Sequence, residues 1–276
     1  MSFTTWISDP NVHWNNLTLD TKKRSYDFGR RLYTFQVEKK KYWLKFHVAD
    51  TDPVIECAFQ CELDFYQLAS KKSQHFLLPY HIIQMEQTPQ CLNLETKGSG
   101  LILLDAENFF TDVLLSKNIA SIQQKIGHAL DALDHMHQIG WIHGDLKVEH
   151  FRLYEGSCRL IDFEQSFQSH CSIPIMNATP HYMAPELFHG EAKSIQSDLY
   201  ALGMIVYEWL TQTKLQAKTY HDWAVLHCQQ LQIQLPQDFT CLFPFLNGLM
   251  QKHIELRFKS VADAKDCLNT IGLLRT

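Results

Sequence analysis

The sequence predicts an α+β protein in which strands and helices are segregated along the chain. Strand-like segments fill the first third, and helical patterns fill the remaining two thirds. At about 150 residues per domain, a chain of 276 residues allows one large domain or two lobes. A short connector near residues 105–108 separates the two parts. We therefore expect an N-terminal lobe of about residues 1–105 and a C-terminal lobe of about residues 106–276.

The first third contains the clearest strand patterns. Residues 31–38 (RLYTFQVE) and 42–48 (YWLKFHV) are strand-like segments on either side of Lys39–Lys41 and predict a hairpin. The Asp-Pro pair at 52–53 supplies an N-cap and a first helical residue, so a helix over about residues 54–70 should follow. Residues 101–104 (LILL) predict a short buried strand.

Helical periodicity dominates the rest of the chain. Apolar residues recur at spacings of 3 and 4 over residues 119–136, which predicts a helix that ends near Gly140. A second helix, over about residues 198–211, is apolar nearly all round, so we expect it to be buried. Two more helical patterns follow over about residues 245–251 and 261–271.

Composition and charge exclude several classes of function. Lys and Arg total 25 and Asp and Glu total 30, a net charge of −5, so we expect no nucleic-acid partner. The longest membrane-like stretch, residues 199–210, is well short of the roughly 20 residues of a spanning helix, so we predict no membrane span. The start of the chain lacks a basic segment followed by an apolar run. The eight cysteines contain no C-x-x-C pair, so we expect reduced, mostly buried thiols and a cytoplasmic location.

Three short clusters between the two long helices carry the chemistry. They are H-G-D-L-K-V-E-H at 143–150, L-I-D-F-E at 160–164 and T-P-H-Y-M-A-P-E at 179–186. In this order and spacing, the chain resembles the eukaryotic-type protein kinases from about residue 30 to about residue 270. The resemblance implies one protein kinase-like domain over residues 1–276. Its N-lobe would be a small antiparallel sheet with one main helix, and its C-lobe would be mainly helical.

The resemblance also implies roles for residues in these clusters. Asp145 would accept the proton of the attacking hydroxyl, and Lys147 would neutralise the γ-phosphate of ATP. Asp162 would hold Mg²⁺ or Mn²⁺, which suit hard oxygen ligands. Thr179 matches the threonine that supports the catalytic Asp and Lys in Ser/Thr-directed kinases, and Lys147 also favours Ser/Thr over Tyr.

The front lobe would bind the nucleotide. W-L-K, ending at Lys45, resembles the family's lysine strand, and Glu62 stands in the predicted helix where the partner of that lysine is found. Lys45 would contact the α- and β-phosphates while Glu62 orients it. Backbone groups around Asp105 and Glu107 would bind the adenine edge. Gly29 is the only glycine where the family has a glycine-rich loop.

Two structural contacts also follow from the resemblance. Arg257 stands where the family keeps an arginine that pairs with the glutamate of A-P-E, here Glu186. Asp198, at the start of the buried helix, should tie the backbone of the catalytic loop. We expect His135 and His137 to be packing and hydrogen-bonding residues.

The nucleotide and metal sites depart from the family pattern in two ways. No G-x-G-x-x-G precedes Lys45. The basic residues of that window are either point charges for phosphates or solvated loop residues; they are Lys22, Lys23, Arg24, Arg30 and Arg31. His150 replaces the asparagine of the catalytic loop. Imidazole suits Mn²⁺ or Zn²⁺ better than Mg²⁺, so His150 either ligates the metal or hydrogen-bonds the loop.

Two further departures concern regulation. Gly144 replaces the H-R-D arginine, which usually pairs with a phosphorylated loop. Its absence predicts activity that does not depend on loop phosphorylation. Glu164 replaces the D-F-G glycine and either stiffens the segment or adds a carboxylate near the metal.

These features predict an ATP-dependent phosphotransferase, foremost a Ser/Thr protein kinase with a protein substrate. One alternative is a small-molecule or sugar kinase of the same fold. The H-G-D and I-D-F-E segments of this chain resemble those of aminoglycoside and choline phosphotransferases. A histidine at position 150 is similar to the pattern of the lipopolysaccharide-core sugar kinases. Such relatives generally lack A-P-E and its arginine, and both are present here. The other alternative is a catalytically weak pseudokinase that acts as a nucleotide-binding or scaffold module. The sequence makes no prediction about oligomeric state.

Overall fold

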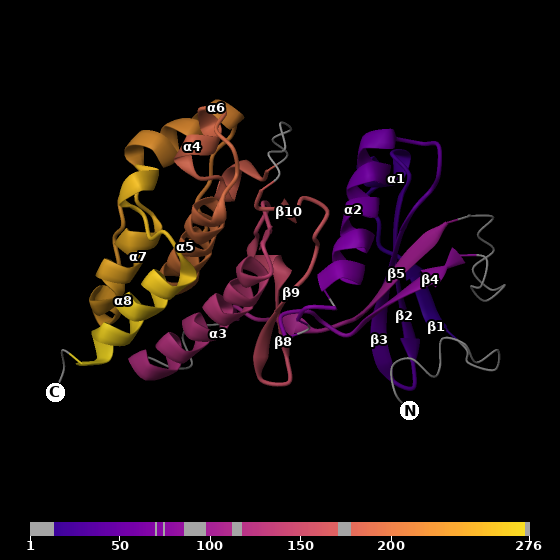
Figure 1. The fold of residues 1–276 in the computed structure, drawn as a ribbon, viewed down its shortest axis with the longest axis horizontal. Helices are drawn as coiled ribbons and strands as arrows, with labels where there is room; N and C mark the ends of the chain where they lie inside the picture. Colours follow the sequence, from indigo (N-terminus) through magenta and orange to yellow (C-terminus); the bar gives the residue numbers. More distant parts are fainter. Residues whose placement is uncertain are drawn as a thin grey trace. The chain divides into compact units, whose positions relative to one another are not determined.

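The computed structural model describes residues 14–69, 71–73, 75–85, 98–111, 118–170 and 178–273. The chain divides into two compact units, Met1–Glu107 (unit 1) and Asn108–Thr276 (unit 2). The predicted fold class is confirmed, because unit 1 holds an antiparallel sheet with one long helix and unit 2 is mainly helical (Figure 1). Residues 1–13, which lack a basic segment followed by an apolar run, lie outside the described residues.

The strands of unit 1 form one antiparallel sheet in the order β1-β2-β3-β5-β4. The elements are β1 (Asn15–Leu19), α1 (Lys23–Asp27), β2 (Arg30–Val37), β3 (Lys40–His47), α2 (Pro53–Ala69), β4 (Tyr80–Gln84) and β5 (Ser99–Leu104). The predicted hairpin is β2–β3. In the register of the sheet, Lys45 lies opposite Leu32 of β2 and Leu101 of β5. Lys45 is therefore on the central strand, where both neighbours hold its backbone in place.

Helix α2 begins where the sequence predicts. The Oδ1 atom of Asp52 accepts hydrogen bonds from the N–H groups of Val54 at 3.0 Å and Ile55 at 3.1 Å. These bonds satisfy two donors that the first turn of a helix leaves unpaired. The buried face of α2 is mainly apolar but includes Glu62. Capping and apolar burial thus fix the helix that carries this carboxylate.

Unit 2 is built around two long helices, α3 (Ile119–Gln138) and α5 (Ile195–Thr211). Almost every residue of α5 from Ser197 onward is buried, as predicted. The other helices of this part are η4 (Val148–His150), η5 (Pro180–Tyr182), α4 (Pro185–Phe188), α6 (Tyr220–Val225), η6 (Leu226–Gln230), η7 (Gln237–Leu242), α7 (Phe243–Leu249), η8 (Ile254–Leu256) and α8 (Val261–Leu273).

Short strands bring the predicted motifs of unit 2 together. The strands are β7 (Trp141–Ile142), β8 (Phe151–Tyr154), β9 (Ser157–Leu160) and β10 (Phe167–Gln168), and β6 (Glu107–Asn108) spans the division between the units. β7 pairs with β10, and β8 pairs with β9, both antiparallel. The H-G-D segment follows β7, and the I-D-F-E segment lies between β9 and β10. Because the two pairs form, these segments lie side by side.

One expectation from composition was wrong. Of the six cysteines in the described part of the chain, only Cys158 is buried, and Cys57 and Cys61 are exposed on α2. The free state of these six thiols agrees with the prediction. The exposed pair lies on the outward face of an amphipathic helix, so helical position decides exposure here and not the chemistry of the thiol. Cys91 and Cys171 lie outside the described residues.

The sequence predicts no helix that spans a membrane. Within the described ranges, no helix combines the length and the apolar character that a membrane crossing requires.

Candidate active site

A buried carboxylate from α5 holds the backbone of the catalytic loop. Asp198 Oδ2 accepts the N–H of His143 at 2.8 Å, and its Oδ1 accepts the N–H of Gly144 at 2.9 Å. His137 Nε2 lies 3.0 Å from Oδ2. Burial raises the pKa of Asp198, but the hydrogen bond and charge of His137, together with His143 and the Gly144 amide, outweigh it and hold that pKa below its ordinary value. The predicted tie between Asp198 and the loop, and the hydrogen-bonding role of His137, are confirmed.

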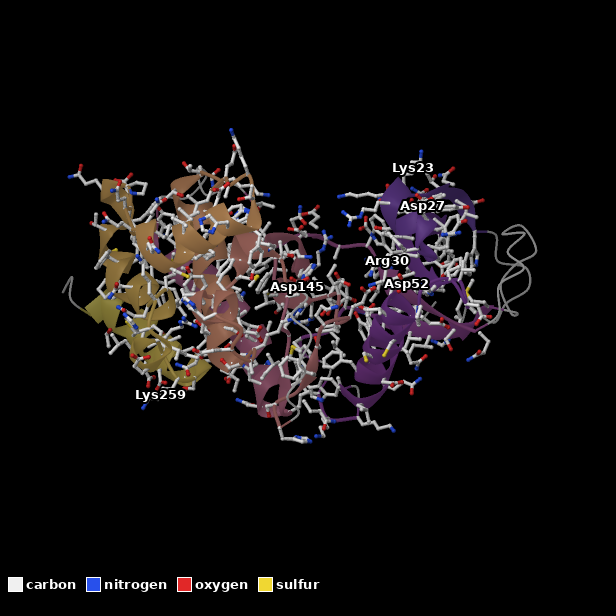
Figure 2. All side chains as sticks on the ribbon, turned by 90° about the horizontal axis from the view of Figure 1, so that it is seen from above. Lys23, Asp27, Arg30, Asp52, Asp145 and Lys259 are labelled. Carbon is white, nitrogen blue, oxygen red and sulfur yellow. The ribbon has the colours of Figure 1, made fainter. Side chains whose placement is uncertain are left out.

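The loop held in this way presents Asp145, which is labelled in Figure 2. Its Oδ1 accepts two hydrogen bonds from Thr179, one from the backbone N–H at 2.8 Å and one from the hydroxyl at 2.9 Å. Its Oδ2 lies 2.9 Å from the Nζ of Lys147. Three residues that the sequence assigned to catalysis therefore meet around one carboxylate.

The proposed metal residues meet next to this cluster. His150 Nε2 lies 3.2 Å from Asp162 Oδ2, and the imidazole is almost fully buried. The backbone N–H of Ile161 donates to the carbonyl of His150 at 3.1 Å, which fixes the I-D-F-E segment against η4. Asp162 and Glu164 each place a carboxylate oxygen within 4.8 Å of the other. The replacement of glycine by Glu164 thus adds an acidic group beside Asp162.

This donor set fits a divalent cation. Two carboxylates supply hard oxygens, and an imidazole adds a nitrogen that Mn²⁺ tolerates better than Mg²⁺ does. Among the described residues, the Nδ1 of His150 is buried and has no hydrogen-bond partner. The other ring nitrogen, Nε2, faces Asp162, so Nε2 is the atom that could share a cation with that carboxylate.

His143 joins the two motifs as a neutral residue. Its Nε2 lies 3.2 Å from the carbonyl of Ile161, and its own carbonyl accepts the hydroxyl of Ser166 at 3.2 Å. Burial, and then the neighbouring His150, lower the pKa of His143 to about 4. An uncharged ring therefore holds the I-D-F-E backbone to the catalytic loop at neutral pH. Ser166 was not anticipated, because no motif marks it.

The glutamate of A-P-E makes the predicted ion pair. Arg257 donates from Nη1 to Glu186 Oε1 at 2.7 Å and from Nη2 to Oε2 at 2.8 Å, and both side chains are buried. Arg257 also donates to the carbonyls of Gln196 and Gln251. This bidentate pair fastens the segment that follows Thr179 to the C-terminal part of unit 2.

In unit 1, Lys45 meets its predicted partner. Lys45 Nζ lies 2.7 Å from Glu62 Oε2, with Lys45 9% exposed and Glu62 fully buried. The pair joins the central strand β3 to the buried face of α2. A lysine held at this spot by a buried carboxylate is suited to phosphate contacts as a point charge.

Asp105 is engaged by β3. The indole N–H of Trp43 donates to Asp105 Oδ1 at 2.6 Å, and Lys41 Nζ lies 3.7 Å from Oδ2. The backbone N–H of Asp105 donates to the carbonyl of Lys41 at 2.9 Å. Asp105 can therefore offer its carbonyl to an adenine but not its amide. Glu107 is exposed at the end of unit 1. The Trp43 contact was not anticipated, since it joins residues far apart in sequence.

Gly29 has a structural reason to be glycine. Its φ is +89°, and a Cβ built on it would meet Thr51 Oγ1 at 1.9 Å. Its N–H donates to the carbonyl of Tyr26 at 3.0 Å, and its carbonyl accepts the N–H of Val48 at 2.9 Å. Gly29 has therefore no uncommitted N–H for a phosphate. A short helix, α1, precedes it in place of a glycine-rich loop.

The basic residues of this window do not all behave alike. Arg31 donates a hydrogen bond to the backbone carbonyl of Tyr26 at 2.8 Å. Its guanidinium carbon lies over the Tyr26 ring, 3.4 Å from the ring centre. Lys23 is exposed on α1. Asp27 lies on α1 together with Lys23, so this helix carries both signs of charge; both residues are labelled in Figure 2.

Comparison with known proteins agrees with this geometry. A family model described as "Protein kinase domain" matches residues 81–263, which is more than half of the chain. The chain is 31% identical over 143 residues to serine/threonine-protein kinase AtPK2/AtPK19 of Arabidopsis thaliana, covering 48% of this chain and 28% of that protein. It is 34% identical over 98 residues to a cGMP-dependent protein kinase of Plasmodium berghei, covering 35% and 11%. With human ribosomal protein S6 kinase alpha-6 the values are 32% over 130 residues, covering 43% and 17%. The aligned parts thus span less than a third of the length of these relatives.

Proposed function

We propose that this chain, which belongs to the protein kinase domain family, transfers the γ-phosphate of ATP to serine or threonine hydroxyls of a protein substrate. The observation that carries the proposal is the setting of Asp145, whose two oxygens are held separately by Thr179 and Lys147. A carboxylate fixed in one orientation is ready to accept a proton without first reorganising. Units 1 and 2 together form one catalytic domain in this proposal.

The residues around Asp145 divide the work. Thr179 directs two hydrogen bonds to Oδ1, which sets the plane of the carboxylate. Asp145 accepts the proton of the acceptor hydroxyl as the oxygen attacks phosphorus. Lys147 places its ammonium beside the reacting group, where it neutralises charge on the transferred phosphoryl. Asp198 keeps the loop in this conformation by accepting hydrogen bonds from the amides of His143 and Gly144.

Asp162, His150 and Glu164 would hold the divalent cation. When bound, such a cation would offset the negative charge of the nucleotide phosphates. Asp162 contributes a hard oxygen, and His150 replaces the family's amide oxygen by a nitrogen. Mn²⁺ accepts that mixed set more readily than Mg²⁺, so we propose that Mn²⁺ serves this chain at least as well as Mg²⁺.

Nucleotide binding in unit 1 rests on the Lys45–Glu62 pair. Lys45 would meet the α- and β-phosphates, with Glu62 holding its ammonium in place. The carbonyl of Asp105 and the backbone of Glu107 would receive the adenine edge. Since Gly29 offers no N–H, exposed basic residues of the α1 region would supply charge near the phosphates in its place.

The ion pair of Glu186 with Arg257 supports a protein substrate over a small molecule. It braces the segment after Thr179, which shapes the peptide-binding shelf in the family. Small-molecule kinases of this fold generally lack the pair. The relatives whose names specify serine/threonine-protein kinases support the same choice of acceptor.

The test is phosphate transfer from γ-labelled ATP to acidic and basic protein substrates, with Mg²⁺ and with Mn²⁺. We expect label on serine or threonine, lost by about a thousandfold in Asp145→Ala because the base is removed. Asp266→Ala, an exposed acidic position on α8, is the matched control and should behave as wild type. Label that reaches sugars or amino alcohols but not proteins would point to the small-molecule alternative. No transfer with either metal, and no thermal shift with nucleotide, would exclude both enzyme functions.

A further inference from the structure

Gly144 lies where no other residue fits. Its φ is +75°, in the left-handed region that favours glycine. A Cβ built there would lie 2.8 Å from the carbonyl oxygen of Gln165 and 3.1 Å from Cδ of Lys193. The volume that a side chain at position 144 would begin to fill is therefore bordered by the stem of Lys193.

Lys193 reaches this point from another part of unit 2. It precedes Ser194, the N-cap of α5, in the segment that follows α4. Its side chain is partly buried, and burial lowers the pKa of its ammonium. Asp145 and Asp198 oppose that shift, because both carboxylates favour the charged form. The stem of Lys193 thus borders the residue that precedes Asp145 in the loop, and both carboxylates act electrostatically on its ammonium.

We propose that Lys193 is a positioning residue for Asp145 and supplies from outside the catalytic loop the positive charge that an H-R-D arginine would supply from position 144. This inference rests on the proposed function. The cation belongs to the fold itself and arrives with the start of α5. Asp145 and Asp198 already supply negative charge to this cation, so it needs no phosphorylated side chain as its partner, which accounts for the glycine at position 144.

The positive charge of Lys193 should favour activity but lower the stability of the folded protein. Because the pKa of Lys193 is lowered in the folded protein, its charged form is less favourable there than in the unfolded chain. At neutral pH the folded state therefore carries a cost that a neutral side chain would remove. A residue retained only for folding would show the reverse behaviour, so activity and stability should move in opposite directions.

The first experiment compares Lys193→Met, which keeps the length of the stem, with Lys193→Arg, which keeps the charge. We expect Lys193→Met to lower kcat about tenfold or more with KM for ATP within twofold, and its melting temperature to be equal or higher. Lys193→Arg should restore most of kcat. The control is Lys259→Met, an exposed lysine that Figure 2 shows well away from Asp145. A kcat within twofold of wild type in Lys193→Met, or a loss of kcat accompanied by a lower melting temperature, overturns the proposal.

A second measurement needs no catalysis. Urea denaturation is followed for wild type, Lys193→Met, Asp145→Asn and the double variant. In the Asp145→Asn background Lys193 lacks one compensating carboxylate, so Lys193→Met should raise the midpoint more there than in wild type. Equal shifts in both backgrounds show that the two side chains are not coupled and reject the inference. If wild type transfers no phosphate, the proposed function fails while this cycle still decides the role of Lys193.

Discussion

Asp145 depends on residues from three separate segments of unit 2. Thr179 and Lys147 hold its two oxygens, and Asp198 holds the backbone just before it. Asp198 acts through the amides of His143 and Gly144, and Thr179 and Lys147 act through their short distances to the Asp145 carboxylate. His150 acts in the same way on Asp162, at 3.2 Å. Gly144 and His150, which differ from the family pattern, therefore change the chemistry of the site but leave the contacts around Asp145 in place.

We expect His150 to determine the metal preference of the site. In His150→Asn, an amide oxygen replaces the imidazole, so the ratio of the rate with Mn²⁺ to the rate with Mg²⁺ should fall several-fold. Calorimetric titration of each metal into the nucleotide-loaded protein gives the same comparison without turnover. His128→Asn, a histidine on α3, is the control. An unchanged metal ratio and unchanged affinities would leave His150 as a hydrogen-bonding residue only.

Helices and strands place these residues by their ends and faces. α5 starts at the capping box of Ser194 and Ser197 and therefore sets Asp198 in its first turn. α2 carries Glu62 on its buried face, toward Lys45 on β3. Polar residues in such places are costly unless paired, so each one ties two elements together.

Glu186 of α4 and Arg257, the C-cap residue of η8, form a buried ion pair that ties these two elements together. Arg257→Met leaves Glu186 buried without its partner, so the free energy of unfolding should drop by about 3–5 kcal/mol. Part of the loss should return in the double variant with Glu186→Gln, which removes the uncompensated charge. Urea unfolding measures both, with Lys259→Met as the exposed neighbouring control. A drop under about 1 kcal/mol in Arg257→Met would mean that the pair contributes little.

Across unit 2, two buried histidines make stability depend on pH. Burial, and then the neighbouring His150, lower the pKa of His143 to about 4, and burial and then His181 do the same for His227. In the unfolded chain these rings take up a proton near their ordinary value of 6.5. Between these two values the unfolded state binds more protons than the folded state, so stability falls as the pH is lowered.

The melting temperature should therefore decline steadily from about pH 6.5 to about pH 4. Each such histidine adds at most about 1.4 kcal/mol per pH unit to the slope. His227→Phe keeps a planar ring among Phe188 and Trp223 but cannot titrate, so its slope should be smaller whatever its absolute stability. His253→Gln, at an exposed position, should leave the slope as it is. Equal slopes in wild type and His227→Phe would contradict the assignment of His227.

The elements that the sequence predicted well are those with strong local signals. α3 and α5 have apolar periodicity, and α2 has both periodicity and the Asp52 cap. β1, α1 and β4 were not predicted, because a short strand is stabilised by its partner, and α1 buries none of its five residues. The sequence did not indicate that Gly29 packs against Thr51, because that close approach joins residues 22 positions apart.

The family and the order of its parts can be predicted from the sequence, because H-G-D, I-D-F-E and A-P-E are local patterns with specific spacing. Which groups meet depends on the tertiary structure. Thr179 reaches Asp145 across 34 residues, Asp198 reaches His143 across 55, and Arg257 reaches Glu186 across 71. The approach of the Lys193 stem to Gly144 is another contact between residues far apart in the sequence, and no sequence motif indicates it. Such contacts depend on the path of the whole chain, since an ion pair or hydrogen bond acts over a few ångströms whatever the separation in sequence.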